Sequence, residues 1–411
     1  MKEKKARTYK EDDSLAWRKV LVEEICEKVS VGIVVQPSQY YVTEAEGIRA
    51  FRSGNIGENN VIDADWVYLS KAGNESNAKS ILQEGDVLVV RSGVPGTACV
   101  LPREFAGSNC IDIVFARPKK SDILPEYLAE VTNSPIGRRH VVGSQLGMAL
   151  KHFNVGEYKK LEISLPSVQE QRKIIDFLNV WSSLVERYER LIQVKEGLYL
   201  AEIAKRIQFG GMKKSLIESF SREVSTRNNE LQVARVLSVT NSNGFVLPED
   251  RFGRRVASED LSSYKIISRG QYAYNPSRIN VGSIARLDDW DKGVLSPMYV
   301  VFELDEKKID SDYFLHWLNS SETRARIRNS AQGSVRETVP FSALGALPIP
   351  LPKLAQQKAI ARYLNSLRKE IRLLERKVEL LKLQKRGLMQ QLLTGKKRLN
   401  LTAAKRKGPR P

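Results

Sequence analysis

The chain has 411 residues, of which 42% are hydrophobic and 28% are charged, a balance typical of an ordinary globular protein with two to three domains. No apolar run approaches the ~18 residues of a membrane span, and the charged N-terminus has no apolar signal core, so we expect a cytoplasmic protein. Three cysteines without a CxxC pair favour free thiols over disulfides or a zinc site.

The formal net charge of +18 indicates an anionic partner, but the positive charge is unevenly distributed. Residues 353–399 carry +11 and residues 400–411 carry +4, whereas 1–166 are neutral and 213–352 carry only +2. Charge alone would therefore place a nucleic-acid site near the C-terminus. A basic helix is as often simply a solvated face, so this inference needs other support.

Two globular stretches contain short apolar runs typical of strands, each followed by a short helical pattern. In chain order, the predicted strands and helix of the first stretch are 86–90, 111–115 and 125–142, and those of the second are 271–274, 298–302 and 311–330.

A long helix follows each stretch, marked by apolar residues at alternating steps of four and three. The seam of the first helix is Ile174, Leu178, Trp181, Val185, Tyr188 and Ile192. The seam of the second is Ile360, Leu364, Leu367, Ile371, Leu374, Val378 and Leu381. A period of 3.5 residues is typical of a coiled coil, so we expect two helices of roughly 60 Å to pair.

The first long helix also has a second apolar stripe, which predicts a contact with something other than its partner helix. This stripe consists of Phe177, Leu184, Leu191 and Leu198. Ser167 with Glu170 predicts a capping box at the start of the first helix, and Gly395 predicts the end of the second. Gly197 and Gly387 lie inside the helices, either where the backbones approach closely or as tolerated defects.

The two halves of the chain repeat each other at a nearly constant offset. LPSVQEQRKI at 165–174 matches LPKLAQQKAI at 351–360, and the two helical seams coincide at the same offset. The sequence therefore predicts an α+β protein with a pseudo-twofold internal duplication, in which two similar α/β domains are joined and separated by two long antiparallel coiled-coil helices. The expected boundaries are 1–166, 167–212, 213–352 and 353–399, with a basic tail at 400–411.

A catalytic function should leave recognisable residues, and few are present. The three histidines have no metal-ligand spacing, and no phosphate-binding loop occurs. Tyr274–Ser277 (YNPS) lacks the second proline and the aromatic residue of the amino-methyltransferase motif. The sequence favours a binding protein over an enzyme.

Four segments carry a resemblance to a known family. The opening Leu-Pro-x-x-x-[Glu/Gln]-Gln-[Arg/Lys] occurs before both long helices, and the second helix closes with KRGLMQQLLTGKKRL at 385–399. Together with 17–27, these segments resemble the specificity (S) subunits of type I restriction-modification systems, over roughly residues 15–400.

The resemblance implies that each globular domain is a target recognition domain reading one half of a bipartite double-stranded DNA target. The helices would set the gap between the half-sites and dock two methyltransferase (M) subunits, to which restriction (R) subunits add cleavage. The chain itself would be non-catalytic and would bind no cofactor, because S-adenosylmethionine, ATP and Mg²⁺ belong to the partner subunits.

Candidate DNA-contacting residues are cations and hydrogen-bonding side chains expected on loops or short helices of the two domains. In the first domain they are Arg49, Arg52, Arg91, Ser92, Arg138, Arg139 and Lys151. In the second domain they are Ser277, Arg278, Asn280, Arg324, Arg326, Arg328 and Arg336.

Two other functions are compatible with the same sequence. The first is the specificity chain of a related type II enzyme with a bipartite site, whose sequence would show the same features. The second is a coiled-coil scaffold with two protein-binding domains, which would not bind DNA. Salt-dependent binding to duplex DNA with a sequence preference separates a DNA reader from a scaffold.

Overall fold

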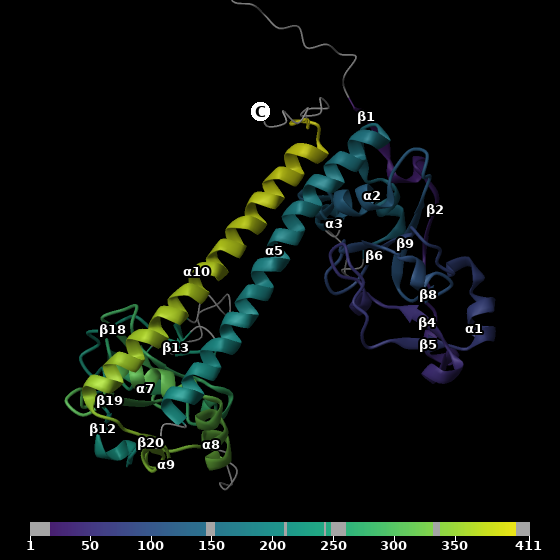
Figure 1. Cartoon of the computed structure of the whole chain (residues 1–411). Coiled ribbons are helices and arrows are strands. Elements are labelled where there is room, and N and C mark those ends of the chain that lie inside the picture. The colour runs from purple at the N-terminus through teal and green to yellow at the C-terminus, as the bar shows by residue number, and fades with distance from the viewer. Residues whose placement is uncertain are drawn as a thin grey trace, which may run out of the picture. The chain divides into compact units, whose positions relative to one another are not determined.

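The computed structural model describes residues 17–144, 153–208, 212–241, 244–247, 260–331 and 338–399. The chain forms two units, of which unit 1 comprises Met1–Arg187 with Val378–Pro411 and unit 2 comprises Tyr188–Lys377. Each unit therefore contains one of the two globular stretches together with part of each long helix (Figure 1).

The described residues of unit 1 form two four-stranded sheets and one two-stranded pair. The first sheet has the antiparallel order β2 (Cys26–Val31), β9 (Ile113–Pro118), β6 (Val87–Val90) and β7 (Ala98–Val100). The second has the order β3 (Tyr41–Val42), β5 (Val67–Leu69), β4 (Ile48–Phe51) and β8 (Asn109–Cys110). The pair consists of β1 (Arg18–Leu21) and β10 (Glu162–Leu165).

The central strand β6 is apolar throughout because both of its faces are covered. Side chains alternate along a strand, so Val87 and Val89 enter one core while Leu88 and Val90 enter the other. The first core contains Tyr127 and is covered by helix α2. The helices of this unit, besides the long ones, are α1 (Lys71–Ser76), α2 (Pro125–Asn133), α3 (Pro135–Ser144) and α4 (Val155–Lys159).

Unit 2 repeats the first sheet of unit 1 strand for strand. Its four-stranded sheet has the order β12 (Ser221–Val224), β19 (Val300–Leu304), β16 (Tyr272–Tyr274) and β17 (Ile284–Arg286). The pair β11 (Lys214–Leu216) and β20 (Pro348–Pro350) corresponds to β1 and β10. The helices among the described residues of this unit, besides the long ones, are α7 (Ser311–Leu318), α8 (Ser321–Ala331) and α9 (Phe341–Gly345).

The two units differ beyond that shared sheet. Where unit 1 has its second four-stranded sheet, the described residues of unit 2 form two separate pairs, β13 (Ser238–Val239) with β14 (Phe245–Val246) and β15 (Lys265–Ser268) with β18 (Lys292–Leu295). The duplicated scaffold is thus retained, and the part attached to it diverges.

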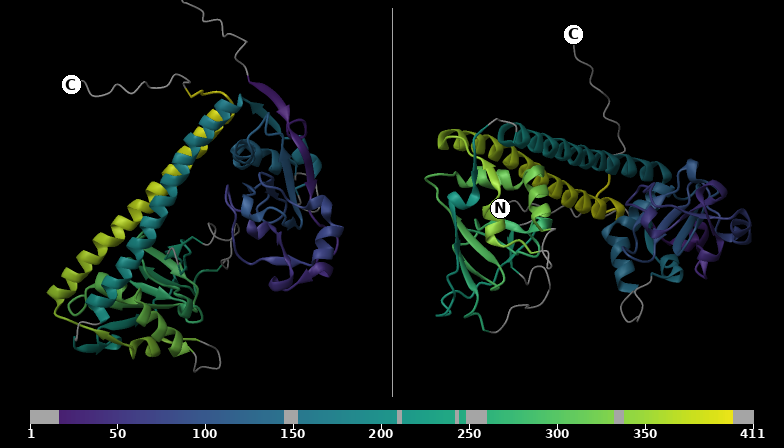
Figure 2. Two further views of the ribbon diagram at one scale, coloured as in Figure 1. Left: turned by 45° about the vertical axis from the view of Figure 1, so that its right-hand side comes forward. Right: turned by 90° about the horizontal axis from the view of Figure 1, so that it is seen from below.

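The long helices are α5 (Val168–Ile203), which continues into a π-helical turn over Ala204–Gln208, and α10 (Leu354–Leu393). α5 begins in unit 1 and ends in unit 2 while α10 does the reverse, so the helices run antiparallel, and they lie side by side in both orientations of Figure 2. The fold class predicted from the sequence, α+β with an internal duplication, is confirmed.

Helix ends follow the sequence signals. The Ser167 hydroxyl accepts from the Glu170 backbone N–H and the Glu170 carboxylate accepts from the Ser167 N–H, both at 3.3 Å, which confirms the capping box. Gly395 takes a φ of 70°, the left-handed conformation of a helix C-terminus, as predicted. A Cβ at Gly197 or Gly387 would meet no atom within 4 Å, so close approach of the helices does not explain them.

Every position of the two seams is at least partly shielded from solvent, as expected for facing helices. The buried ones are Ile174, Leu178, Val185, Leu364, Ile371, Val378 and Leu381. The half-buried ones are Trp181, Tyr188, Ile192, Ile360, Leu367 and Leu374. Within unit 1, the seam residues Ile174 and Leu178 share a core with Leu392 near the end of α10.

Candidate nucleic-acid interface

The turn between β6 and β7 of unit 1 contains two of the expected contact residues, Arg91 and Ser92. Gly93 takes a φ of 90° here, a conformation that favours glycine, and the chain turns back toward β7. The Arg91 guanidinium forms an ion pair with Asp112, and its Nε donates to the carbonyl of Phe153 at 2.9 Å. A phosphate or base that binds Arg91 therefore has to compete with Asp112.

A hollow of about 440 Å³ lies beside this turn and brings together Arg52 and Ser92, which are far apart in the sequence. Asp65 and Asp112 also line it, and both have a positive φ, of 52° and 50°. Non-glycine residues in that strained region cluster at ligand-contacting sites. Arg52 Nη2 donates to the carbonyl of Asp65 at 2.7 Å, which orients the guanidinium at the edge of the hollow.

Two of the other candidate arginines of unit 1, Arg49 and Arg138, are more strongly engaged with the protein. Arg49 is half-buried, and its guanidinium lies 5.5 Å from the ring centroid of Trp66 and 5.6 Å from that of Phe105. Arg138 donates to the Pro95 carbonyl at 2.9 Å, so it braces the β6–β7 turn.

Arg139 lies one residue further along α3 than Arg138 and is exposed. Its Nε donates to the carbonyl of Pro135 at 3.1 Å, a contact within its own helix, which leaves the rest of the guanidinium at the surface. Lys151 lies outside the described residues.

The corresponding loop of unit 2 connects β16 to β17 and carries Ser277, Arg278 and Asn280. Ser277 and Arg278 are exposed and Asn280 is half-buried. The side chain of Asn275 accepts from the Ser277 N–H at 3.0 Å, and the Asn275 carbonyl accepts from the Arg278 N–H at 2.9 Å, which shapes the turn. The Arg278 guanidinium has no hydrogen bond or ion pair with another described residue.

The same backbone contact anchors both loops. The Phe153 N–H donates to the Arg91 carbonyl at 3.2 Å, and the Val339 N–H donates to the Pro276 carbonyl at 3.1 Å. Phe153 and Val339 are separated by the same offset as the repeated openings of the two long helices, so the two loops occupy equivalent places in the duplicated scaffold.

The arginine cluster of unit 2 lies on α8, and its members have different environments. Arg326 is half-buried and pairs with Glu322, Arg324 donates to the side chain of Asn319 at 3.0 Å, and Arg328 is exposed. Arg336 lies outside the described residues.

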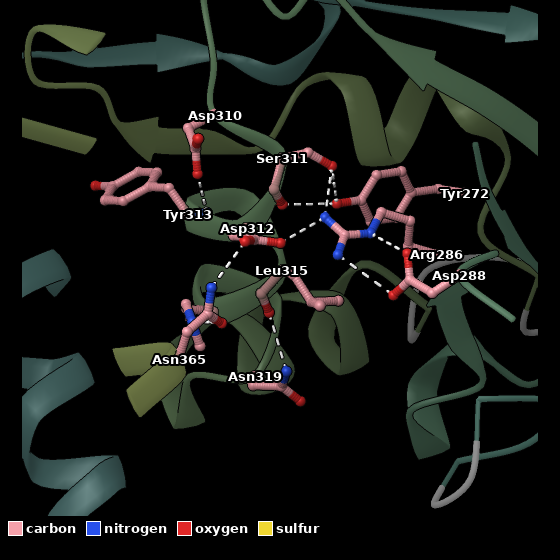
Figure 3. Close-up of polar contacts among 11 residues, drawn as sticks. Tyr272, Arg286, Asp288, Asp310, Ser311, Asp312, Tyr313, Leu315, Asn319 and Asn365 are labelled. Atoms are coloured by element: carbon pink, nitrogen blue, oxygen red, sulfur yellow. Dashed lines mark hydrogen bonds and ion pairs between the residues drawn. The ribbon is translucent and has the colours of Figure 1, made fainter. Parts of the chain in front are cut away.

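A polar network in unit 2 connects the sheet to α10 (Figure 3). Arg286 of β17 pairs with Asp312 of α7 at 2.7 Å, and the Asn365 amide of α10 donates to the other oxygen of Asp312 at 2.7 Å. Burial alone would raise the pKa of Asp312, but the hydrogen bonds from Arg286 and Asn365 hold it below its usual value. The sheet of unit 2 is thereby tied to the long helix α10 through charged and polar groups.

The network ends at a buried histidine. His316 contacts the side-chain oxygen of Asn365 at 3.0 Å through Nε2 and the Tyr199 hydroxyl of α5 at 2.8 Å through Nδ1. Burial lowers the pKa of His316 from its usual 6.5, so the folded chain favours the neutral ring. The stability that depends on this neutral ring is present above the unfolded pKa and is lost as pH falls through the lower, folded value.

We expect thermal unfolding of unit 2 to shift to lower temperature as pH falls from about 8 to about 5, more steeply in the wild-type chain than in H316Q. The glutamine retains hydrogen-bonding groups and does not titrate. Melting curves recorded across this range provide the comparison, and parallel pH dependences in the two chains would contradict the assignment to His316.

Sequence reasoning missed the two aspartates that line the hollow in unit 1. The signal for Asp112 was present, because a charged residue interrupts the otherwise apolar strand expected at 111–115. No neighbouring residue in the sequence indicates that Asp65 lines the hollow, because its contact is with Arg52, 13 residues earlier.

The described residues hold no cluster of three His, Cys, Asp or Glu side chains suited to a metal ion. None of the helices within the described ranges combines the length and apolar composition needed to cross a bilayer.

Comparisons with known proteins agree on one family. The model of the type I restriction modification DNA specificity domain matches residues 17–196 and 261–383. The type I restriction enzyme MjaVIII specificity subunit of Methanocaldococcus jannaschii is 22% identical over 356 residues, which cover 79% of this chain and 82% of that protein. The StySPI specificity subunit of Salmonella potsdam is 23% identical over 386 residues, covering 86% and 82%.

A solved structure supports the fold. A chain from a structure of type I R-M complex assembly and conformational transition aligns with a TM-score of 0.61 and 16% identity, covering 94% of this chain and all of that one. At this identity the likeness concerns the fold alone. The family model spans more than half of the chain, and the chain therefore belongs to the type I restriction-modification DNA specificity family, whose members are non-catalytic target-recognition subunits.

Proposed function

We propose that this specificity subunit reads a bipartite double-stranded DNA target, with one half-site for each recognition domain (expected at 1–166 and 213–352). The observation that carries the proposal is the pair of equivalent loops, β6–β7 and β16–β17. They share the backbone anchor to Phe153 and Val339, yet their side chains differ. A duplicated scaffold with divergent loops suits the recognition of two unrelated half-sites.

The loop chemistry suits contact with DNA. Base edges in the major groove are read by arginine, asparagine and serine side chains, while phosphates are bound by cations and backbone amides. Arg278 has an exposed guanidinium without a partner among the described residues, so we assign it base reading in unit 2. Arg52, at the edge of the hollow, is its strongest counterpart in unit 1.

We further propose that the long helices dock two methyltransferase subunits. The second apolar stripe of α5 supports this, because Leu184, Leu191 and Leu198 are exposed on the helix. Val180 and Val194 continue the same stripe and are exposed as well. Restriction subunits join such a complex in turn, and S-adenosylmethionine, ATP and Mg²⁺ are bound by the partners and not by this chain.

The most direct test maps methylated adenines in DNA from cells with and without this gene. A bipartite methylation motif that disappears with the gene supports the proposal. An unchanged methylome under confirmed expression overturns it. Binding of the purified complex to duplexes that carry the motif, measured at several salt concentrations, then separates specific recognition from general attraction to phosphate.

We expect R278A to weaken binding to the specific duplex by about 1–3 kcal/mol and to relax the preference at one position of the half-site read by unit 2. Loss of a base contact has this effect, whereas loss of a phosphate contact weakens binding to all sequences alike. Fluorescence titrations with single-base variants of the target measure both effects. R269A is the matched control, since Arg269 is an exposed arginine of unit 2 already paired with Asp291. An R278A chain with unchanged affinity and preference would exclude Arg278 as a reader.

A further inference from the structure

Gln171 joins the start of α5 to the start of α2 within unit 1. The residue is fully buried, with 0% exposure. Its Nε2 donates to the carbonyls of Asp122 at 2.9 Å and Pro166 at 3.0 Å, and its Oε1 accepts from the Leu124 N–H at 2.8 Å. Leu124 is the N-cap residue of α2, so one amide side chain connects the N-termini of two helices.

Gln357 makes the same three bonds in unit 2. It is 1% exposed, its Nε2 donates to the carbonyls of Lys308 at 3.1 Å and Pro352 at 2.8 Å, and its Oε1 accepts from the Asp310 N–H at 2.8 Å. Asp310 is the N-cap residue of α7. Each partner stands at the same offset from its counterpart in unit 1 as Gln357 does from Gln171, so the duplicated chain keeps the whole arrangement.

A second bond reinforces each junction at the strand before the long helix. The Tyr127 hydroxyl donates to the Ser164 carbonyl at 3.0 Å, and the Tyr313 hydroxyl donates to the Pro350 carbonyl at 2.8 Å. These pairs are related by the same offset as the two glutamines. The junctions are thus the same in both units, although the loops that face outward differ.

A buried amide at this position restricts the orientation of the helix start. An apolar side chain of the same volume would fill the space, but it would not select one orientation of the helix start, because packing is not directional. Three hydrogen bonds to backbone groups of two separate segments do select one orientation, and every polar atom of the buried amide is satisfied.

We propose that Gln171 and Gln357 are positioning residues, each of which fixes the direction in which a long helix leaves its recognition domain. They thereby determine which gap between half-sites the subunit accepts. This inference rests on the proposed bipartite reading, because without two half-sites there is no gap to select.

The test uses the complete complex with the duplex target identified by methylation mapping, together with duplexes whose gap is one base pair longer or shorter. Q171M and Q357M keep the side-chain length and remove the hydrogen bonds. Because a net hydrogen bond corresponds to about a five- to tenfold change in an equilibrium constant, we expect each variant to reduce the preference for the native gap by about that factor. The sequence preference within each half-site should not change.

L88A is the control for a general loss of stability, since Leu88 is buried in the unit 1 core that contains no long-helix residues. It should lower the melting temperature and leave gap selectivity intact. If wild-type protein discriminates between gaps and the glutamine variants discriminate equally well, the positioning role is wrong while bipartite reading stands. If wild-type protein shows no bipartite preference at all, the proposed function itself fails.

Hydrogen exchange on the full chain tests the same contacts without DNA. In Q171M the Leu124 amide should lose protection while the Asp310 amide keeps it, and Q357M should show the reverse. Each variant thus serves as the other's control. Should either methionine variant fail to fold, Q171E and Q357E replace them, since glutamate keeps the acceptor and removes the amide donor. Retained gap selectivity in those variants would likewise overturn the proposal.

Discussion

Replacing Leu191 and Val194 of α5 with aspartate is expected to abolish stable assembly with a methyltransferase subunit while the chain stays folded. The two side chains are 38% and 68% exposed, and they belong to the apolar stripe outside the seam. Buried interface anchors contribute about 2 kcal/mol or more each, so the double variant L191D/V194D should weaken association roughly a thousandfold. Aspartate lowers helix propensity by only about 0.7 kcal/mol per position, a cost that a 36-residue helix can absorb.

Co-purification and size-exclusion chromatography with the methyltransferase subunit of the same system measure the effect, with a melting curve as the check on folding. V35D is the matched control, because Val35 is 72% exposed and belongs to the globular part of unit 1 and to neither long helix. A double variant that still assembles with wild-type affinity would exclude this face of α5 as the docking surface.

The second large effect is expected from D86A, which should destabilise unit 1 by about 3–5 kcal/mol. The Asp86 side chain is 0% exposed and that of Arg117 is 19% exposed, and the carboxylate accepts two bonds of 2.8 Å from the guanidinium. It also accepts from the Gln83 N–H at 2.8 Å. Removing the carboxylate leaves a mostly buried guanidinium without its partner. An unpaired buried charge destabilises the fold more than the loss of the whole pair would.

Thermal unfolding and hydrogen exchange of the β6 and β9 amides measure this loss. D86N keeps the shape and part of the hydrogen bonding, so it should cost less than D86A. Equal melting temperatures for D86A and the wild type would show that the pair contributes little.

Unit 2 suggests a variant that should restore stability, because a different pair of side chains occupies the positions equivalent to Asp86 and Arg117. Gln271 and Glu303 are joined by a bond of 2.9 Å, and Glu303 also pairs with Arg222 on the neighbouring strand. Lys28 lies opposite position 117 in the register of β2 and β9. The double variant D86Q/R117E copies the unit 2 arrangement and should recover part of the stability that D86A loses.

Much of the scaffold was predictable because its signals are periodic and local. A seam such as Ile174 to Ile192 depends on spacing along one helix, and the repeat of LPSVQEQRKI as LPKLAQQKAI requires only a comparison of the chain with itself. The strands at 86–90 and 271–274 were found for a similar reason, since short apolar runs report burial directly.

The candidate site was less predictable, because the availability of a cation depends on its neighbours in space. Arg91 and Arg278 look alike in the sequence, yet Arg91 is paired with Asp112 and Arg278 has no such pair among the described residues. Arg138 was an equally plausible contact, and it braces the β6–β7 turn instead. The R278A prediction above tests whether Arg278 reads a base.

The sequence by itself determined that the chain is a duplicated α+β protein with two long helices, since apolar periodicity and repetition can be recognised from the order of residues alone. Only the tertiary structure decided how the repeated glutamines are used. Gln171 and Gln357 stand out in the alignment of the two halves, but their bonds reach Leu124 and Asp310, each 47 residues earlier. Hydrogen bonds between distant segments depend on the folded path of the backbone, and no local pattern encodes them.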